Sequence, residues 1–196
     1  MWIVTGLGNP GSRYLKTRHN IGFMVIDLLS ETLNIPLADK EIYMFGRGNA
    51  EGKGVVLLKP LVFMNKSGIA VRKVLRKFNT APENLIVIHD DLDMESGILK
   101  IRKNGSSGGH KGIDSIIQET GSREFIRVKL GIGRDNSVPV EKYVLSTFKP
   151  FEKDDIRNGI IQAVDVVRAI MRDDVAKAMN RYNRSAAPRA PRASLL

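Results

Sequence analysis

The sequence predicts a single three-layer α/β domain, in which a mixed, mostly parallel sheet is flanked by helices. Short apolar runs without polar alternation, typical of strands buried on both faces, alternate along the chain with segments whose apolar residues recur at helical spacing. The length of 196 residues and a hydrophobic content of 42% suffice for one core, and no internal repeat or linker divides the chain. We therefore expect one domain, formed by residues 1–183.

The first half of the chain predicts a strand, a helix, a hairpin and a second helix. Residues 2–7 are apolar and β-branched, and glycines end this run, so we expect a buried strand. Apolar residues recur every three or four positions over residues 20–33, which predicts a helix. The turn AEGKG separates two strand-like pieces, residues 41–49 and 53–59, as in a hairpin. A second amphipathic helix is expected over residues 65–78.

The second half alternates strands and helices in the same way. The run NLIVIHD, residues 84–90, lacks alternation and predicts a strand covered on both faces. We expect further strands at residues 98–102 and 126–132, and helices at residues 111–118 and 151–172. Ligands of open α/β sheets bind outside the carboxyl ends of the strands, so the polar residues at the end of the run NLIVIHD are candidates for a site.

The charge balance favours a polyanionic partner such as nucleic acid. Lys and Arg number 31 against 21 Asp and Glu, which gives a formal net charge of +10. Residues 184–196 are rich in Ala, Pro and Arg and contain no acid, so we expect them to form a disordered basic tail. Basic residues also repeat at i,i+4 on the helix predicted at residues 65–78, where we interpret them as a solvated face.

Composition also excludes several classes of protein. The absence of cysteine excludes a disulfide framework, a thiol nucleophile and a Cys-ligated metal, and it fits a reducing compartment. No apolar run approaches the ~18 residues of a membrane span. The chain starts on a strand-like segment without a basic leader, so we expect no secretory signal or transit peptide. We therefore expect a cytoplasmic protein without membrane association.

Two glycine-rich segments match known motifs in form but not in context. GLGNPG, residues 6–11, fits the dinucleotide fingerprint, but Pro10 precedes its last glycine and no helix opens there. We interpret this segment as a tight turn that presents Asn9 and backbone amides to a cleft. GSSGG, residues 105–109, fits the nucleophile elbow around Ser107, but the acid and then the histidine must follow, and the only later histidine, His110, is three residues away with no acid between. We interpret it as a flexible loop beside a site.

Acidic residues cluster at the end of the strand predicted at residues 84–90. The segment HDDLDMES contains Asp90, Asp91, Asp93 and Glu95, and carboxylate oxygens are the ligands that Mg²⁺ prefers. A magnesium-dependent nuclease is therefore one hypothesis. The other interpretation is an acidic turn after a buried strand, because such dense negative charge repels a nucleic-acid backbone unless cations offset it.

His19 is the candidate general base. It lies in the polar segment TRHN, just before a predicted helix, and we expect this segment to meet the end of the strand that carries Asp90 at one sheet edge. A carboxylate behind a histidine fixes the tautomer of the ring and stabilises the imidazolium that forms when water is deprotonated. The other two histidines of the chain, His89 and His110, are expected to be structural residues.

Four segments together resemble the bacterial peptidyl-tRNA hydrolase family. They are GLGNPGSRY followed by RHNIGF, KPLVFMNKSG, NLIVIHDDLD, and SSGGHKG followed by FIRVKLGIGR, and they stand in the family's order within residues 1–182. The resemblance implies a monomeric α/β enzyme that needs no metal or other cofactor. It also implies that the enzyme hydrolyses the ester between a peptide and the 3′-terminal ribose of tRNA, so that peptidyl-tRNA is its partner.

The resemblance assigns roles to single residues of these segments. His19 matches the catalytic base of the family, and Asp90 matches its orienting carboxylate. Asn9 is similar to the asparagine that helps to distinguish blocked aminoacyl ends from free amines. Ester hydrolysis needs an activated water and neutral donors for the oxyanion, which agrees with these roles. The positions that contact the terminal adenosine or the peptide, or line their pocket, are matched by Tyr14, Phe63, Met64 and Asn65.

Three basic residues are expected to bind tRNA. Many family members carry asparagine after Gly-Gly-His, where this chain has Lys111, and we expect this change to alter a contact rather than to abolish activity. The resemblance matches Arg102 and Lys129 to two basic side chains that clamp the 5′-phosphate of tRNA. An arginine can fork onto a phosphate, whereas a lysine acts as a point charge.

The sequence thus predicts a metal-independent peptidyl-tRNA hydrolase. In this hypothesis His19 activates water, Asp90 steadies His19, and Asn9 and Asn65 hold the peptide and the ester. Two alternatives stay open: a magnesium-dependent nuclease that uses the acidic cluster, and an RNA-binding module of this fold that has lost catalysis.

Overall fold

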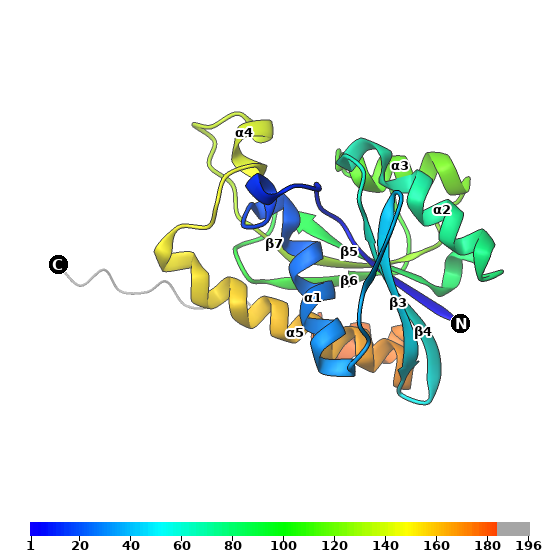
Figure 1. The fold of residues 1–196 in the computed structure, drawn as a ribbon. Coiled ribbons are helices and arrows are strands. Elements are labelled where there is room, and N and C mark those ends of the chain that lie inside the picture. The colour runs from blue at the N-terminus through cyan, green and yellow to red at the C-terminus, as the bar shows by residue number, and fades with distance from the viewer. Residues whose placement is uncertain (184–196) are drawn as a thin grey trace.

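The computed structural model describes residues 1–183, and these form the predicted α/β domain with one sheet between two helical layers (Figure 1). The basic tail predicted at residues 184–196 lies outside the described residues. The strands run in the order β2-β3-β4-β1-β5-β7-β6. Their bounds are Trp2–Gly6 (β1), Ala38–Lys40 (β2), Tyr43–Ala50 (β3), Lys53–Pro60 (β4), Leu85–Asp91 (β5), Leu99–Arg102 (β6) and Ile126–Gly131 (β7).

The central strands are parallel and the outer ones are antiparallel. β1 pairs in parallel with β4 on one side and with β5 on the other, and β5 pairs in parallel with β7. The predicted hairpin is β3 and β4, while β2 and β6 close the two edges in antiparallel pairs. The carboxyl ends of β1 and β5 therefore lie side by side at one edge of the sheet, as the sequence predicted for a site.

Helices cover both faces of this sheet. α1 and α5 lie on one face, and α2 and α3 pack together on the other (Figure 1). The helices are Ile21–Leu33 (α1), Ser67–Lys77 (α2), Lys111–Thr120 (α3), Val140–Val144 (α4), Lys153–Arg172 (α5) and Val175–Tyr182 (α6). Short 3₁₀ turns span Ser12–Tyr14 (η1), Arg18–Asn20 (η2), Met64–Lys66 (η3), Pro82–Asn84 (η4) and Pro150–Glu152 (η5).

Each central strand contributes to two cores, which explains why its sequence does not alternate with polar residues. In β1, Ile3 faces the core under α2 and α3, and Val4 faces the core under α1 and α5. In β5, Leu85 faces the core under α2 and α3, and Ile86 faces the core under α1 and α5. All four side chains are fully buried. Successive side chains of a strand point to opposite faces, so a strand between two helical layers is apolar throughout.

Three short elements were not predicted from the sequence. β2 has three exposed residues, and α4 is a helix of five residues that follows Pro139. The N-cap of α6 is Asp174, whose side chain accepts a hydrogen bond from the Lys177 N–H at 2.8 Å. This N-cap was a usable sequence signal, because aspartate is preferred at that position. No helix of residues 1–183 combines the length and the apolar character that crossing a bilayer requires.

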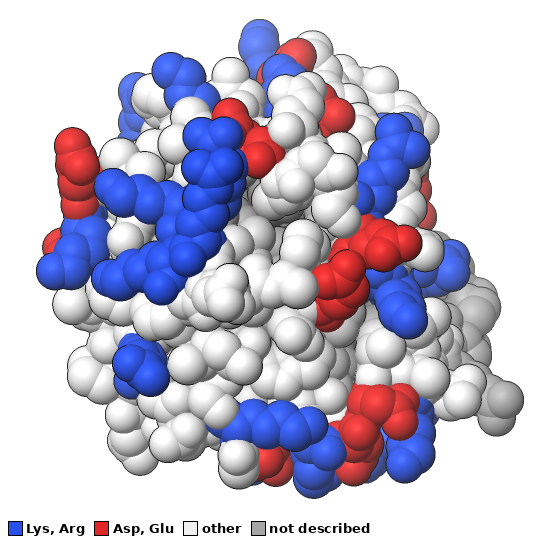
Figure 2. Space-filling model, turned by 90° about the vertical axis from the view of Figure 1, so that its right-hand side faces the viewer, with Lys and Arg blue, Asp and Glu red and all other residues white. Residues whose placement is uncertain are grey.

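Basic side chains gather on the face that carries α2 (Figure 2). Two of the basic residues of this helix have acidic partners. The Arg72 guanidinium lies 3.1 Å from the Glu119 carboxylate, and the Lys73 ammonium lies 3.8 Å from that of Glu41. Exposed ion pairs of this kind contribute little to stability.

A buried ion pair ties the start of α5 to the segment before α1. Arg18 is only 1% exposed, and its guanidinium donates two hydrogen bonds to the Glu152 carboxylate at 2.7 and 2.6 Å. It also donates to the Ile132 carbonyl at 3.0 Å and lies over the ring of Tyr143 in α4. Because a buried charge without partners is costly, this pair fixes α4, α5 and the end of β7 relative to residue 18.

The pair makes the free energy of unfolding depend on pH. Burial raises the pKa of Glu152, but hydrogen bonds from Arg18, from the Lys149 backbone and from Ser96 outweigh burial and lower it below its ordinary value of 4.5. A carboxyl group with a lowered pKa in the folded state stabilises the fold fully above its unfolded pKa, and this contribution is lost as the pH falls through the folded value.

Glu152→Gln should therefore destabilise the protein by about 3 kcal/mol at neutral pH, because it leaves the Arg18 guanidinium buried without a counterion. Urea unfolding of both proteins from pH 7 to pH 3 should show the difference shrinking below about pH 4.5. Glu41→Gln, in the exposed pair with Lys73, is the control and should change little. A difference between Glu152→Gln and the original protein that is independent of pH would contradict this account.

Candidate active site

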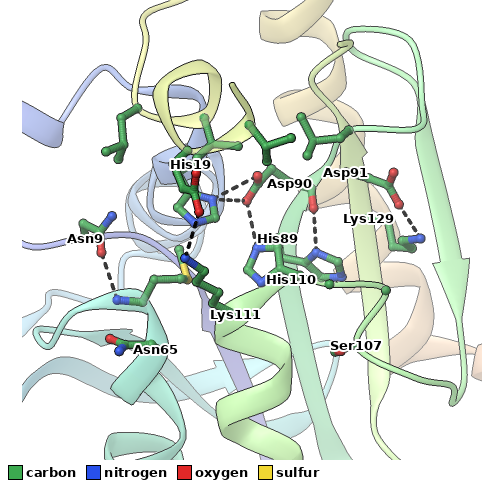
Figure 3. Close-up of a pocket in the computed structure, with 18 of the residues that line it drawn as sticks. Asn9, His19, Asn65, His89, Asp90, Asp91, Ser107, His110, Lys111 and Lys129 are labelled. Atoms are coloured by element: carbon green, nitrogen blue, oxygen red, sulfur yellow. Dashed lines mark hydrogen bonds and ion pairs between the residues drawn. The ribbon is translucent and has the colours of Figure 1, made fainter. Parts of the chain in front are cut away.

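A cavity of about 630 Å³ opens at the edge of the sheet where β1 and β5 end (Figure 3). The loops after β1, β4 and β5, the glycine-rich loop before α3, and α4 surround it. Of the residues predicted for the site, the cavity is lined by Asn9, Tyr14, His19, Phe63, Met64, Asn65, Asp90, Lys111 and Lys129. Arg102 does not line it. It lies exposed on β6, where its Cα pairs with that of Arg127.

The segment that carries His19 is fixed directly against the ends of β1 and β5. Asn20 is buried, its side-chain oxygen accepts from the Asn9 N–H, and its side-chain nitrogen donates to the Asn9 carbonyl, both at 2.9 Å. Gly22 follows in the first turn of α1. A Cβ there would lie 2.4 Å from the Leu7 nitrogen and 2.5 Å from the Ile88 carbonyl oxygen, so only glycine permits this close packing.

Asp90 lies between two imidazoles. Its Oδ1 is 2.9 Å from His19 Nδ1 and 3.0 Å from His110 Nε2, and its Oδ2 is 3.0 Å from His19 Nδ1 (Figure 3). The carboxylate is only 3% exposed. Burial by itself raises the pKa of Asp90, but the effect of the two histidines is opposite and larger. The pKa of Asp90 therefore lies well below the usual range. Asp90 is therefore an acceptor, which places the proton of a neutral His19 on Nδ1 and leaves Nε2 as the basic nitrogen.

Asn9 offers amide donors to the cavity. The Met64 N–H donates to Asn9 Oδ1 at 2.9 Å, and because a backbone N–H can only donate, this contact identifies the side-chain oxygen. The amide nitrogen of Asn9 is then the group left to face a ligand. Asn65 and Phe63 are exposed at the rim, on the 3₁₀ turn η3 and just before it.

The acidic cluster does not gather around one point. Asp91 forms an ion pair with Lys129, and the Asp93 carboxylate lies 3.5 Å from the Arg134 guanidinium. Within residues 1–183, the histidine and acidic side chains whose ligand atoms all lie within 4.8 Å of one another are His19, Asp90 and His110. Asp91 and Asp93 are not among them, which argues against the magnesium site expected for a nuclease.

His110 lies in the site, although the sequence suggested only a structural role. It is the residue before α3 and lines the cavity together with Ser107 of the glycine-rich loop. Its position at the end of the glycine-rich loop could have indicated this from the sequence, because that loop lies at the same sheet edge as the end of β5. His89 is buried, with Nδ1 2.7 Å from the Asp90 carbonyl oxygen. Arg127 donates to the Gly105 and Ser106 carbonyls and so holds the loop that was expected to be flexible.

Lys111 reaches across the mouth of the cavity. Its ammonium lies 3.4 Å from the Glu141 carboxylate on α4, and both side chains are exposed. An exposed pair at this distance is weak, so either charge can exchange its partner for a ligand.

The chain matches the model of the peptidyl-tRNA hydrolase family over residues 3–190. A protein of Thermodesulfovibrio yellowstonii named peptidyl-tRNA hydrolase is 47% identical over 186 residues, which is 94% of this chain and all of that protein. Its namesake from Bacillus subtilis is 42% identical over 93% of this chain and 98% of its own length. The crystal structure of peptidyl-tRNA hydrolase from Acinetobacter baumannii superposes with a TM-score of 0.89 at 35% identity, covering 93% of this chain and 94% of that one. The chain belongs to the peptidyl-tRNA hydrolase family.

Proposed function

We propose that this chain hydrolyses the ester between a peptide, or an N-blocked aminoacyl group, and the 3′-terminal ribose of tRNA, with water activated by His19 and without a metal. The observation that carries the proposal is the contact of His19 Nδ1 with the buried Asp90 carboxylate, inside a cavity large enough for a peptide end and a nucleoside. Family membership supports the substrate. Because peptidyl-tRNA forms during translation, we place this activity in the cytoplasm. The resemblance to the family is what leads us to assign it to a monomer.

The reaction needs one base that later acts as an acid. His19 Nε2 takes a proton from water, and the resulting hydroxide bonds to the ester carbonyl carbon. Asp90 stabilises the imidazolium that forms. When the tetrahedral intermediate collapses, the bond between the carbonyl carbon and the ribose 3′-oxygen breaks, and the proton on Nε2 passes to that oxygen. The products are a peptide acid and a free tRNA 3′-hydroxyl group.

Neutral side chains bind the reacting group. The Asn9 amide nitrogen donates either to the oxyanion or to the carbonyl of a blocked amino group, and a free ammonium, which has no acceptor, gains nothing from this donor. Tyr14, Phe63 and Met64 supply aromatic and apolar surface for the terminal adenosine or the peptide, and Asn65 offers a polar group at the rim. Contacts of this kind do not depend on the peptide sequence.

The pairing of the charged groups supports chemistry without a metal. His110 Nδ1 accepts hydrogen bonds from the Gly112 and Ile113 N–H groups, so the proton of a neutral ring occupies Nε2, the atom that faces Asp90. A metal ion at His110 Nε2 would have to displace that proton. Lys129 offsets Asp91 in the same cavity, which further reduces the attraction for a divalent cation.

The decisive experiment measures hydrolysis of N-acetyl-aminoacyl-tRNA beside free aminoacyl-tRNA, each with and without a chelator. We expect turnover of the blocked substrate alone, unaffected by chelation. His19→Ala should lower kcat by about 10²-fold or more with little change in binding, because the group acts in the transition state. Weakened binding with unchanged kcat would contradict this role. Chelator-sensitive cleavage of the RNA backbone would instead support the magnesium-dependent nuclease. Binding of tRNA without any turnover would support the inactive RNA-binding module.

A second prediction concerns the clamp on the 5′-phosphate of tRNA that we assign to Arg102 and Lys129. Arg102→Ala should weaken binding of tRNA substrates and reduce the slope of log affinity against log salt by about 1, because one phosphate contact is lost. A peptidyl-nucleoside without the 5′-phosphate should be hydrolysed as before. Arg157→Ala, an exposed arginine on α5, is the control and should change neither substrate. Equal losses on the two substrates would refute the assignment.

A further inference from the structure

His110 makes hydrogen bonds at both ring nitrogens, and the two partners are of opposite kind. On one side, Nδ1 lies 3.1 Å from the Gly112 nitrogen and 3.3 Å from the Ile113 nitrogen, at the N-terminus of α3. On the other side, Nε2 lies 3.0 Å from Asp90 Oδ1. Backbone N–H groups can only donate, so Nδ1 must present a lone pair. A neutral ring then carries its proton on Nε2 and donates it to the carboxylate.

We propose that His110 is a positioning residue that holds the Asp90 carboxylate as a neutral donor, with its tautomer fixed by the N-terminus of α3. The inference rests on the proposed role of Asp90 as the support of His19. It gives His110 a part in the reaction through Asp90 rather than through contact with the substrate.

The N-terminus of α3 favours the Nε2–H tautomer of this ring for two reasons. A proton on Nδ1 would face two N–H donors and would break both hydrogen bonds that the ring accepts. The partial positive charge of a helix N-terminus also disfavours an imidazolium beside it. A proton on Nε2 alone thus lets His110 accept from the start of α3 and donate to Asp90 at the same time.

Two donors define the orientation of the carboxylate better than one. His19 Nδ1 is nearly equidistant from the two oxygens of Asp90, at 2.9 and 3.0 Å, so this contact alone does not select one of them. His110 bonds to Oδ1 only. The second donor thus fixes the rotation of the carboxylate and with it the plane in which His19 is held.

His89 restricts the ring of His110 from behind. The two rings meet edge to face with centroids 4.7 Å apart. His89 Nδ1 faces the Asp90 carbonyl oxygen at 2.7 Å, which requires a proton on that nitrogen. Burial lowers the pKa of His89 well below its usual value, so this ring is neutral. We therefore expect protons on Nδ1 of His19 and His89, and on Nε2 of His110.

Nitrogen-15 NMR of the imidazole rings tests the tautomers without any assay of activity. The chain contains three histidines, so long-range proton–nitrogen correlations of the full chain at neutral pH give three ring patterns. One should be the Nε2–H tautomer, and it should be the pattern that His110→Asn removes. An Nδ1–H tautomer or an imidazolium at His110 would overturn the proposal.

Two substitutions separate the capping of α3 from the support of Asp90. An asparagine oxygen accepts from the first N–H groups of a helix, but its side chain is too short to reach Asp90 as well. We expect His110→Asn to lower the Tm less than His110→Ala, because both variants lose the hydrogen bond to Asp90 but only the alanine variant also loses the cap of α3. On N-acetyl-aminoacyl-tRNA, His110→Asn should lower kcat about tenfold and change KM less than twofold, because one hydrogen bond to a charged group is lost.

The outcomes distinguish this inference from the proposed function. A wild-type kcat in His110→Asn would refute the positioning role, and a raised KM with unchanged kcat would show a substrate contact instead. If the original protein does not hydrolyse N-acetyl-aminoacyl-tRNA, the proposed function fails, while the NMR result still decides the tautomer of His110.

Discussion

The carboxylate of Asp90 is the constraint on which the site depends. It is a buried negative charge at the end of β5, and such a charge is stable only when donors satisfy it. The donors come from His19, which is 71 residues away in sequence, and from His110, which is 20 residues away. A single group thus draws the segment before α1 and the start of α3 to the same sheet edge, and the cavity opens where these segments meet.

The surroundings of Asp90 hold this arrangement from two sides. Asn20 ties the turn after β1 to the segment of His19, and Gly22 allows α1 to approach the ends of β1 and β5. On the other side, Arg18 fixes α4, which forms a wall of the cavity, through its contacts with Glu152 and Tyr143. The residues on either side of His19 are therefore both buried and hydrogen-bonded, and this holds the histidine between them in place.

The sequence predicts those features of the fold that depend on local pattern. The sequence pattern predicted the strands β1 and β5, the amphipathic helices and the position of Asp90 at a strand end. Periodicity and burial determine directly which residue types occur at each position of these elements. The contact of His110 with Asp90 could not be predicted from the sequence, because it depends on the three-dimensional path of a glycine-rich loop. α4 was not predicted for a similar reason. Its five residues are too few to show a helical period, and packing against Arg18 stabilises it.

The ion pair between Lys129 and Asp91 affects which anions can compete at the cavity. This lysine is already neutralised by a neighbour, so an incoming anion must take the ammonium away from a carboxylate. Chloride, with one diffuse charge, is a poor competitor for such a partner, whereas a terminal phosphate monoester brings about two charges and several acceptor oxygens. A 5′-phosphate at Lys129, as proposed above, would therefore have to compete with the Asp91 carboxylate for this ammonium, and its larger charge suits it to do so.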